Sequence, residues 1–245
     1  SDQQSIRDYA QGFLATGETI DVLINNAGVM VCPFGKTADG IEMQFGTNHI
    51  GHFLLTNLLM PAILAGANPR IVNLSSAGHT HSDVNLDDPN FEKSEYNAWE
   101  SYGRSKSANI HFTQEIVRRY GDRIQSFAVH PGVIMTELGR HLTPELMNEM
   151  TERVKSRATS SSQAKETGAL PFKSVEAGAA TQVWASVTEK LSENNGAYLG
   201  DCQVGVEGGN PSESGYLPYI FNKDTAEALW SLSEKLVKQE FPQLT

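Results

Sequence analysis

The stretch that decides the fold is Arg70-Ile-Val-Asn-Leu74, which Ser75 and Ser76 follow at once. Similar apolar runs occupy residues 21–25 and 124–129, and a weaker one occupies residues 197–199. Near-continuous apolar runs of this length are typical of strands buried on both faces of a parallel sheet. The sequence therefore predicts a parallel sheet built around residues 70–74.

Helical patterns lie between these runs. They are amphipathic or mostly apolar, and they cover residues 5–15, 41–64, 102–120, 175–191 and 223–240. The alternation of strand and helix predicts βαβ units, and hence an α/β, Rossmann-like doubly wound parallel sheet. We expect residues 1–245 to form one such domain. Small or polar residues end each strand, where ligands bind in sheets of this kind.

The composition excludes several classes of protein. The 245 residues are 39% hydrophobic, and the 21 glycines add roughly 9%, so the sum of about 48% is typical of a globular chain and not of a disordered one. With 19 Lys plus Arg against 29 Asp plus Glu, the net charge of −10 argues against a nucleic-acid partner. No run approaches the ~20 apolar residues of a membrane span. The two cysteines form no disulfide framework, so we expect a reduced, cytoplasmic setting.

Two irregular stretches interrupt the alternation. Residues 82–100 are polar and are predicted to form an inserted loop, in which Trp99 is a candidate substrate contact. Residues 136–172 contain one helical piece, 144–154, which begins with Thr-Pro. An irregular stretch after a strand end is a candidate substrate lid.

Tyr102-Gly-Arg-Ser-Lys106 is the most informative stretch for chemistry. Tyr102 and Lys106 are four residues apart and so share one face of a helix. An ammonium beside a phenol favours the phenolate, so we expect the pKa of Tyr102 to fall below its usual value of about 10. Such a tyrosine can exchange a proton with a carbonyl or alcohol oxygen. Taken alone, this spacing is more often a coincidence of surface helices.

Other polar residues lie where the same chemistry would need them. Ser76 ends a predicted strand, where its hydroxyl can donate to a substrate oxygen or serve only as a cap. Asn48 lies inside a predicted apolar helix, where a polar side chain needs a partner. It is either a functional group of the site or a buried amide whose hydrogen bonds are satisfied. The histidine pairs 49/52 and 79/81 have no third ligand nearby, so we predict no metal site. We expect His79 and His81 at a substrate rim or in solvent.

Five blocks of the sequence resemble the short-chain dehydrogenase/reductase family, and most closely its retinol-dehydrogenase-like branch. That branch also carries a long insert between the Ser-Ser strand and the Tyr helix. The resemblance runs from the first residues to about residue 236, and its blocks are residues 21–30, 47–56, 70–78, 101–115 and 127–138.

The resemblance implies a role for individual residues. Tyr102 resembles the general acid/base, and Lys106 the residue that lowers its pKa and binds the nicotinamide ribose. Ser76 resembles the donor to the substrate oxygen, and Asn48 the amide that holds a relay water. Further cofactor contacts are implied for Asn25, Ala27, Gly28, Pro131, Gly132, Val133 and Thr136. The implied cofactor is NADP or NAD, and the implied substrate is a small carbonyl or alcohol compound.

One part of the family pattern has no counterpart in these residues. The family begins with a strand, a Thr-Gly-x-x-x-Gly-x-Gly turn and a helix that holds the pyrophosphate. Without those strands, residues 21–25 become an exposed apolar sheet edge. We interpret the sequence as a fragment of a longer enzyme. The alternatives are a homo-oligomer or partner complex formed through that edge, and a chain that has lost the redox role.

The favoured function is therefore an oxidoreductase that transfers a hydride between a nicotinamide cofactor and a carbonyl or alcohol carbon. One alternative is a cofactor-independent cyclase, isomerase or dehydratase on the same scaffold, in which Tyr102 still moves a proton. The other is a non-catalytic binding protein. Fold alone does not choose among them.

Overall fold

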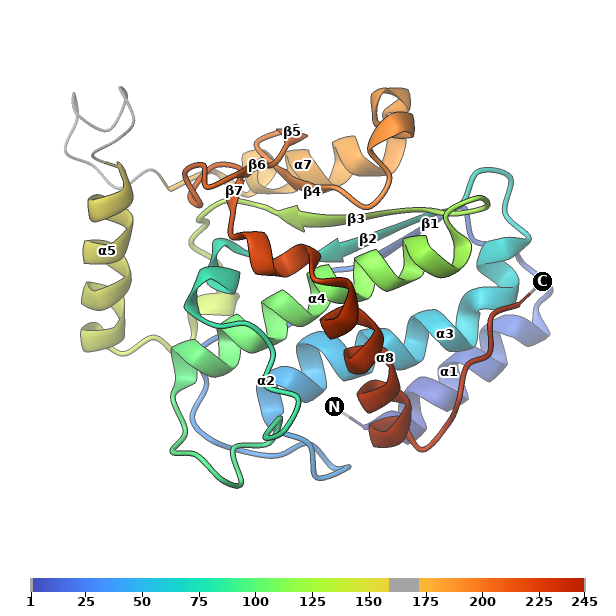
Figure 1. The fold of residues 1–245 in the computed structure, drawn as a ribbon, viewed down its shortest axis with the longest axis horizontal. Coiled ribbons are helices and arrows are strands. Elements are labelled where there is room, and N and C mark those ends of the chain that lie inside the picture. The colour runs from blue at the N-terminus through green and yellow to red at the C-terminus, as the bar shows by residue number, and fades with distance from the viewer. Residues whose placement is uncertain (1, 159–171, 245) are drawn as a thin grey trace.

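A five-stranded sheet forms the centre of the molecule (Figure 1). The computed structural model describes residues 2–158 and 172–244. The strands are β1 (Val22–Asn25), β2 (Arg70–Leu74), β3 (Gln125–His130), β4 (Tyr198–Gly200) and β5 (Gln203–Val204), in that spatial order. β1 to β4 are parallel, and β5 returns antiparallel to β4. The predicted parallel sheet is confirmed.

Helices cover both faces of this sheet, as a doubly wound fold requires (Figure 1). On one face lie α1 (Gln3–Ala15), α3 (Gly51–Leu64), α4 (Ala98–Tyr120) and α8 (Lys223–Val237). On the other face lies α7 (Val175–Val187), and α5 (Pro144–Ala158) stands at the side of the body. The Rossmann-like fold class is therefore confirmed. None of the helices in the described part of the chain combines the length and apolarity needed to cross a bilayer.

Aromatic packing holds the larger helical layer together. The ring of Phe53 on α3 lies 5.5 Å from Phe112 on α4 and 5.0 Å from Trp230 on α8, centroid to centroid. All three side chains are buried, and burying each stabilises the fold by roughly 1.5–3 kcal/mol or more. On the opposite face, Phe127 and Val129 of β3 belong to a second core cluster that continues into α7. The sheet is thus fixed from both sides.

Some element boundaries differ from the sequence prediction. The predicted helix 41–64 is interrupted, because a π-helical turn (Gly46–Ile50) separates the short α2 (Met43–Phe45) from α3. α4 begins four residues before Tyr102, where the Asn97 side chain accepts a hydrogen bond from the Glu100 amide and caps the helix. The inserted loop therefore ends at residue 97. α7 ends at Val187, and a 3-10 helix (Glu189–Asn194) follows it.

The short elements were not predicted at all. β5, β6 (Val206–Glu207) and β7 (Gly215–Tyr216) have two residues each, which is too few for a period to show in the sequence. Further 3-10 turns cover Ala77–His81, Glu137–Gly139 and Pro218–Phe221. Of the predicted lid stretch, residues 159–171 lie outside the described part of the chain.

β1 forms an edge of the sheet. It pairs with β2 on one side, from Val22 opposite Arg70 to Asn25 opposite Asn73. Val22 and Ile24 on this strand are each 39% exposed, whereas the β2 residues Ile71 and Val72 are fully buried. The apolar edge expected from the sequence is present.

Candidate active site

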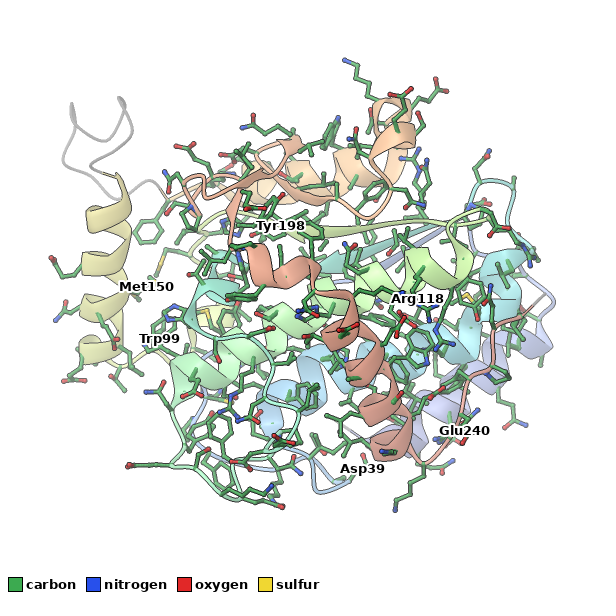
Figure 2. The ribbon with its side chains drawn as sticks, viewed as in Figure 1. Asp39, Trp99, Arg118, Met150, Tyr198 and Glu240 are labelled. Atoms are coloured by element: carbon green, nitrogen blue, oxygen red, sulfur yellow. The ribbon has the colours of Figure 1, made fainter. Side chains whose placement is uncertain are left out.

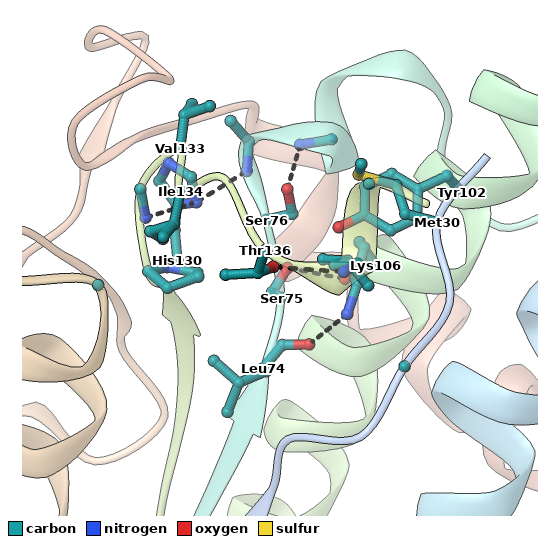
Figure 3. Close-up of a pocket in the computed structure, with 18 of the residues that line it drawn as sticks. Met30, Leu74, Ser75, Ser76, Tyr102, Lys106, His130, Val133, Ile134 and Thr136 are labelled. Carbon is teal, nitrogen blue, oxygen red and sulfur yellow. Dashed lines mark hydrogen bonds between the residues drawn. The ribbon is translucent and has the colours of Figure 1, made fainter. Parts of the chain in front are cut away.

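A cavity of about 530 Å³ opens at the carboxyl ends of β2 and β3 and beside the segment that follows β1 (Figure 3). This volume is in the range of small-molecule and cofactor sites. Most of the residues singled out in the sequence line it: Ala27, Gly28, Ser76, Tyr102, Lys106, Pro131, Gly132, Val133 and Thr136. The topology therefore brings together blocks that are more than a hundred residues apart in the chain.

Asn25 and Asn48 are not among the described residues that line this cavity. Asn25 is buried at the end of β1, and its amide donates to Asn73 Oδ1 at 2.8 Å and to Thr56 Oγ1 at 3.0 Å. It therefore ties β1 to β2 and to α3, and its neighbour Asn26 lines the cavity instead. The cofactor contact expected of Asn25 stays a prediction, and its side chain is engaged by the neighbouring strand and helix and does not line this cavity.

Asn48 braces the site from behind. It lies in the π-helical turn, a feature often found at functional sites. Its Oδ1 accepts from the Val29 amide at 2.8 Å, and its Nδ2 donates to the Val29 carbonyl and to Ser105 Oγ, each at 2.9 Å. Asn48 thereby joins the segment after β1 to the helix that carries Tyr102. The backbone carbonyl of Asn48 contacts His52 Nδ1 at 2.8 Å.

Tyr102 lies on the cavity wall with its ring against the turn that follows β2. A Cβ atom at Gly78 would lie 2.6 Å from Tyr102 Cε1, so only glycine allows this close approach. Burial raises the pKa of Tyr102 to about 12, and a hydrogen bond with the Ser76 side chain opposes the rise. The expected fall in this pKa is therefore wrong for the chain by itself, because desolvation of the phenolate dominates.

Lys106 holds its ammonium below the Tyr102 ring, with Nζ 5.6 Å from the ring centroid. Nζ donates to the Leu74 carbonyl at 3.0 Å, at the end of β2 (Figure 3). Burial lowers the pKa of Lys106 to about 8. Ser75 completes the connection, since its hydroxyl donates to the Lys106 carbonyl at 2.9 Å. The last residues of β2 and one turn of α4 are thus locked together.

Apolar and aromatic side chains form the outer wall, and Trp99, expected as a substrate contact, is one of them. Its Nε1 donates to Glu149 Oε2 at 3.2 Å, which attaches α5 to the start of α4. Figure 2 shows Trp99 and the α5 residue Met150 on this side of the molecule. The His81 ring stacks on Trp99 with centroids 5.3 Å apart. Sequence reasoning missed the apolar members of this wall: Met30, Leu138, Leu142 and Met150. Scattered single residues in irregular segments give no periodic signal.

The two histidines expected at a rim differ. His81 lines the cavity, as a rim residue would. His79 is fully buried beneath it, so its predicted rim or solvent position is wrong. Its ring packs 5.2 Å from that of Tyr198 on β4, centroid to centroid.

The donors around the cavity fit the nicotinamide riboside part of a dinucleotide. Lys106 supplies an ammonium, and Asn26 and Thr136 supply an amide and a hydroxyl group for ribose and carboxamide oxygens. At Gly28 a Cβ would lie 3.0 Å from Asn48 Oδ1 and 3.9 Å from Lys106 Nζ. The missing side chain keeps the space over the lysine open for a ligand.

Comparisons with known proteins bear on these residues. The family described as short chain dehydrogenase matches residues 1–146. Retinol dehydrogenase 14 of Homo sapiens is 39% identical over 235 residues, which are 96% of this chain and 63% of that protein. Short-chain dehydrogenase/reductase prx1 of Penicillium roqueforti is 39% identical over 243 residues, 96% of this chain and 67% of that protein.

A solved structure shares the fold of this chain. The crystal structure of an uncharacterized protein from Mycobacterium paratuberculosis superposes with a TM-score of 0.69 at 32% identity. That superposition covers 98% of this chain and 74% of the other. The chain thus matches these relatives over nearly all of its own length, and it spans about two thirds of theirs.

Proposed function

Because the chain belongs to the short-chain dehydrogenase family, in the branch of the retinol dehydrogenases, we propose that it is a nicotinamide-dependent oxidoreductase that interconverts a carbonyl compound and an alcohol. The observation that carries the proposal is that Tyr102 and Ser76 meet at Gly78 on the wall of a cavity: a Cβ added there would lie 2.6 Å from Tyr102 Cε1 and 3.3 Å from Ser76 Oγ, and the Lys106 ammonium lies beside the same ring. The proposed catalytic residues are Ser76, Tyr102 and Lys106, with Asn48 as their brace.

Proton transfer is the task of Tyr102 in this proposal. In the reducing direction its phenol gives a proton to the substrate oxygen, and in the oxidising direction the phenolate takes one. Ser76 Oγ accepts from the Gly78 amide at 3.0 Å, which leaves the hydroxyl hydrogen free to point at the substrate oxygen. Lys106 stabilises negative charge on the phenol oxygen through its nearby ammonium.

The cofactor is proposed to be NADP or NAD. When bound, it accepts or supplies the hydride. Lys106 would hold the ribose, Ala27 and Gly28 would pass beneath the nucleotide, and residues 131–136 would lie along the carboxamide. The support is that all of these residues line the same cavity as Tyr102.

The walls of the cavity favour a substrate with an apolar body. Met30, Leu138, Leu142 and Met150 are apolar, and Trp99 adds an aromatic face. A hydrophobic wall with a few polar groups at one end is typical of small-molecule sites, in which the polar groups set the orientation. We propose that the carbonyl oxygen faces Ser76 and Tyr102 while the apolar body lies along this wall.

The test combines binding and turnover. The purified chain is titrated with NADPH and with NADH while nicotinamide fluorescence is followed, and then mixed with a panel of apolar aldehydes and ketones. The proposal expects reduction that Tyr102→Phe slows by about 10²–10⁴-fold while nucleotide affinity stays within about threefold. Turnover that is unchanged in Tyr102→Phe, or no binding of either nucleotide, would overturn it.

A further inference from the structure

We propose that His79 and His130 are positioning residues that hold the peptide group between Ser76 and Ala77 from both sides and thereby aim the Ser76 hydroxyl at the Tyr102 phenol. The inference rests on the proposed function for its catalytic consequence. The hydrogen bonds themselves do not depend on that function.

One histidine holds the carbonyl side of this peptide group. His79 Nδ1 lies 2.7 Å from the Ser76 carbonyl oxygen, which also accepts from the His79 amide at 3.1 Å. Because a carbonyl only accepts, Nδ1 carries the hydrogen. His79 Nε2 then accepts from the Leu217 amide at 3.4 Å. The neutral ring is therefore fixed in one tautomer between the serine turn and the C-terminal segment.

The other histidine holds the amide side. His130 at the end of β3 accepts at Nδ1 from the Ala77 amide at 3.2 Å and from the Gly132 amide at 3.4 Å (Figure 3). Two backbone donors meet at this nitrogen, so Nδ1 carries no hydrogen and His130 has the opposite tautomer to His79. Burial lowers the pKa of His130 to about 3, which keeps the ring neutral. Both imidazoles are almost completely buried.

His79 and His130 together form a clamp on the Ser76–Ala77 peptide group. The position of this clamp explains why it bears on catalysis. Ser75 is still held by the sheet, since its amide donates to the Val129 carbonyl at 2.8 Å. β2 ends at Leu74, and the two histidines bind the Ser76–Ala77 peptide group just beyond the strand. The same turn carries Gly78, which touches the Tyr102 ring. A rotation of the Ser76–Ala77 peptide would therefore move the serine hydroxyl relative to the phenol.

Isosteric substitutions separate the hydrogen bond from the shape. Asn and Leu both branch at Cγ, but only Asn can accept or donate where His Nδ1 does. His130→Leu and His79→Leu remove the two bonds, whereas His130→Asn and His79→Asn retain a group that can form them, on a side chain with the same number of heavy atoms as leucine. A thermal unfolding scan on each variant establishes that the fold is present.

Two readouts need neither cofactor nor substrate. Native-state hydrogen exchange at the Ala77 amide should be at least about tenfold faster in His130→Leu than in His130→Asn. The ¹³Cζ resonance of Tyr102, assigned by its loss in Tyr102→Phe, should move in both Leu variants in the direction that Ser76→Ala moves it. In the Asn variants it should stay near the wild-type position.

The third readout is turnover. Each Leu variant should lower kcat by about tenfold or more, the equivalent of one neutral hydrogen bond, and leave the KM for the nucleotide within about twofold. Each Asn variant should keep kcat within about threefold of the wild type. Absence of turnover in the wild type would refute the proposed function, and the two ligand-free readouts would still decide the clamp. Leu and Asn variants that agree in exchange and in the Tyr102 resonance would overturn it.

Discussion

The Lys106 ammonium lies 5.6 Å from the centre of the Tyr102 ring, and it donates its hydrogen bond to the Leu74 carbonyl. The lysine is therefore anchored to the end of β2. Burial governs both groups, since it raises the pKa of Tyr102 to about 12 and lowers that of Lys106 to about 8. Near neutral pH the cavity wall therefore carries a neutral phenol at Tyr102 and, at Lys106, an ammonium that loses its proton near pH 8.

This pair predicts a pH dependence of nucleotide binding. The ammonium of Lys106 is present below a pH of about 8 and is lost above it, so we expect affinity for NADPH or NADH to fall as the pH rises through that value. Arginine stays charged across this range, so the nucleotide affinity of Lys106→Arg should change little up to a pH of about 9.5. Fluorescence titrations across this range provide the measurement. A wild-type affinity that stays constant up to the same pH would contradict the assignment.

Gly78 makes a second prediction, about the Tyr102 ring. An added Cβ would lie 2.6 Å from Tyr102 Cε1 and 3.3 Å from Ser76 Oγ, so the ring or the serine turn must move. We expect Gly78→Ala to lower kcat by at least tenfold and stability by about 1–3 kcal/mol. Gly12→Ala is the matched control, because nothing lies within 4 Å of the new Cβ on the α1 surface. Steady-state kinetics and urea unfolding of both variants test this prediction. Equal kcat values for Gly78→Ala and Gly12→Ala would refute it.

A third prediction concerns the attachment of α5 to the cavity wall. Trp99 Nε1 donates to Glu149 Oε2 at 3.2 Å. Glu149→Leu removes the acceptor, so we expect KM for an apolar substrate to rise several-fold while kcat stays within about twofold. Glu149→Gln retains an acceptor and should behave like the wild type. If both variants give the same KM, the contact between Trp99 and Glu149 does not shape the site.

The sequence predicted most accurately the features that repeat along the chain. The predicted strand of residues 70–74 agrees residue for residue with β2, because a strand buried on both faces of a parallel sheet is mostly apolar and Ile71, Val72 and Leu74 show this. The long helices were found because their apolar residues recur at helical spacing. Boundaries were less accurate, as at α4, where the start is set by the Asn97 cap and not by the apolar period.

The location of the site followed from the family resemblance of the blocks that carry Ser76, Tyr102 and Lys106, because each of these residues taken alone has commoner structural roles. Tyr102, Lys106 and Ser76 line the cavity as expected. The pKa of Tyr102 was not predictable, because it depends on burial by residues distant in the chain. His79 was misplaced, and Asn25 does not line the cavity, for a related reason: a polar side chain near a strand end can point to a ligand or into the core. Only the packing of neighbouring strands and helices decides which.

The last prediction concerns acid stability, and it depends on histidines buried in the neutral form. Burial lowers the pKa of His49 to about 3 and that of His52 to about 4. His130, with a pKa of about 3, belongs to the same group. An unfolded histidine has a pKa of about 6.5, so between that value and about 4 the unfolded chain binds more protons than the folded one. Stability is therefore complete above a pH of about 6.5 and falls as the pH drops, by about 1 kcal/mol per pH unit for each histidine.

His49 allows a clean test of this slope. Its Nε2 lies 2.9 Å from Ser233 Oγ, between α8 and the π-helical turn, and the amide of a glutamine reaches the same position. His49→Gln should therefore keep the hydrogen bond and remove the titration. Urea unfolding between a pH of about 7.5 and about 4.5 should give a shallower loss of stability for the variant, by about 1 kcal/mol per pH unit below pH 6. Parallel curves for the two proteins would mean that His49 is not buried in the neutral form, and that the interface between α8 and the π-helical turn admits water.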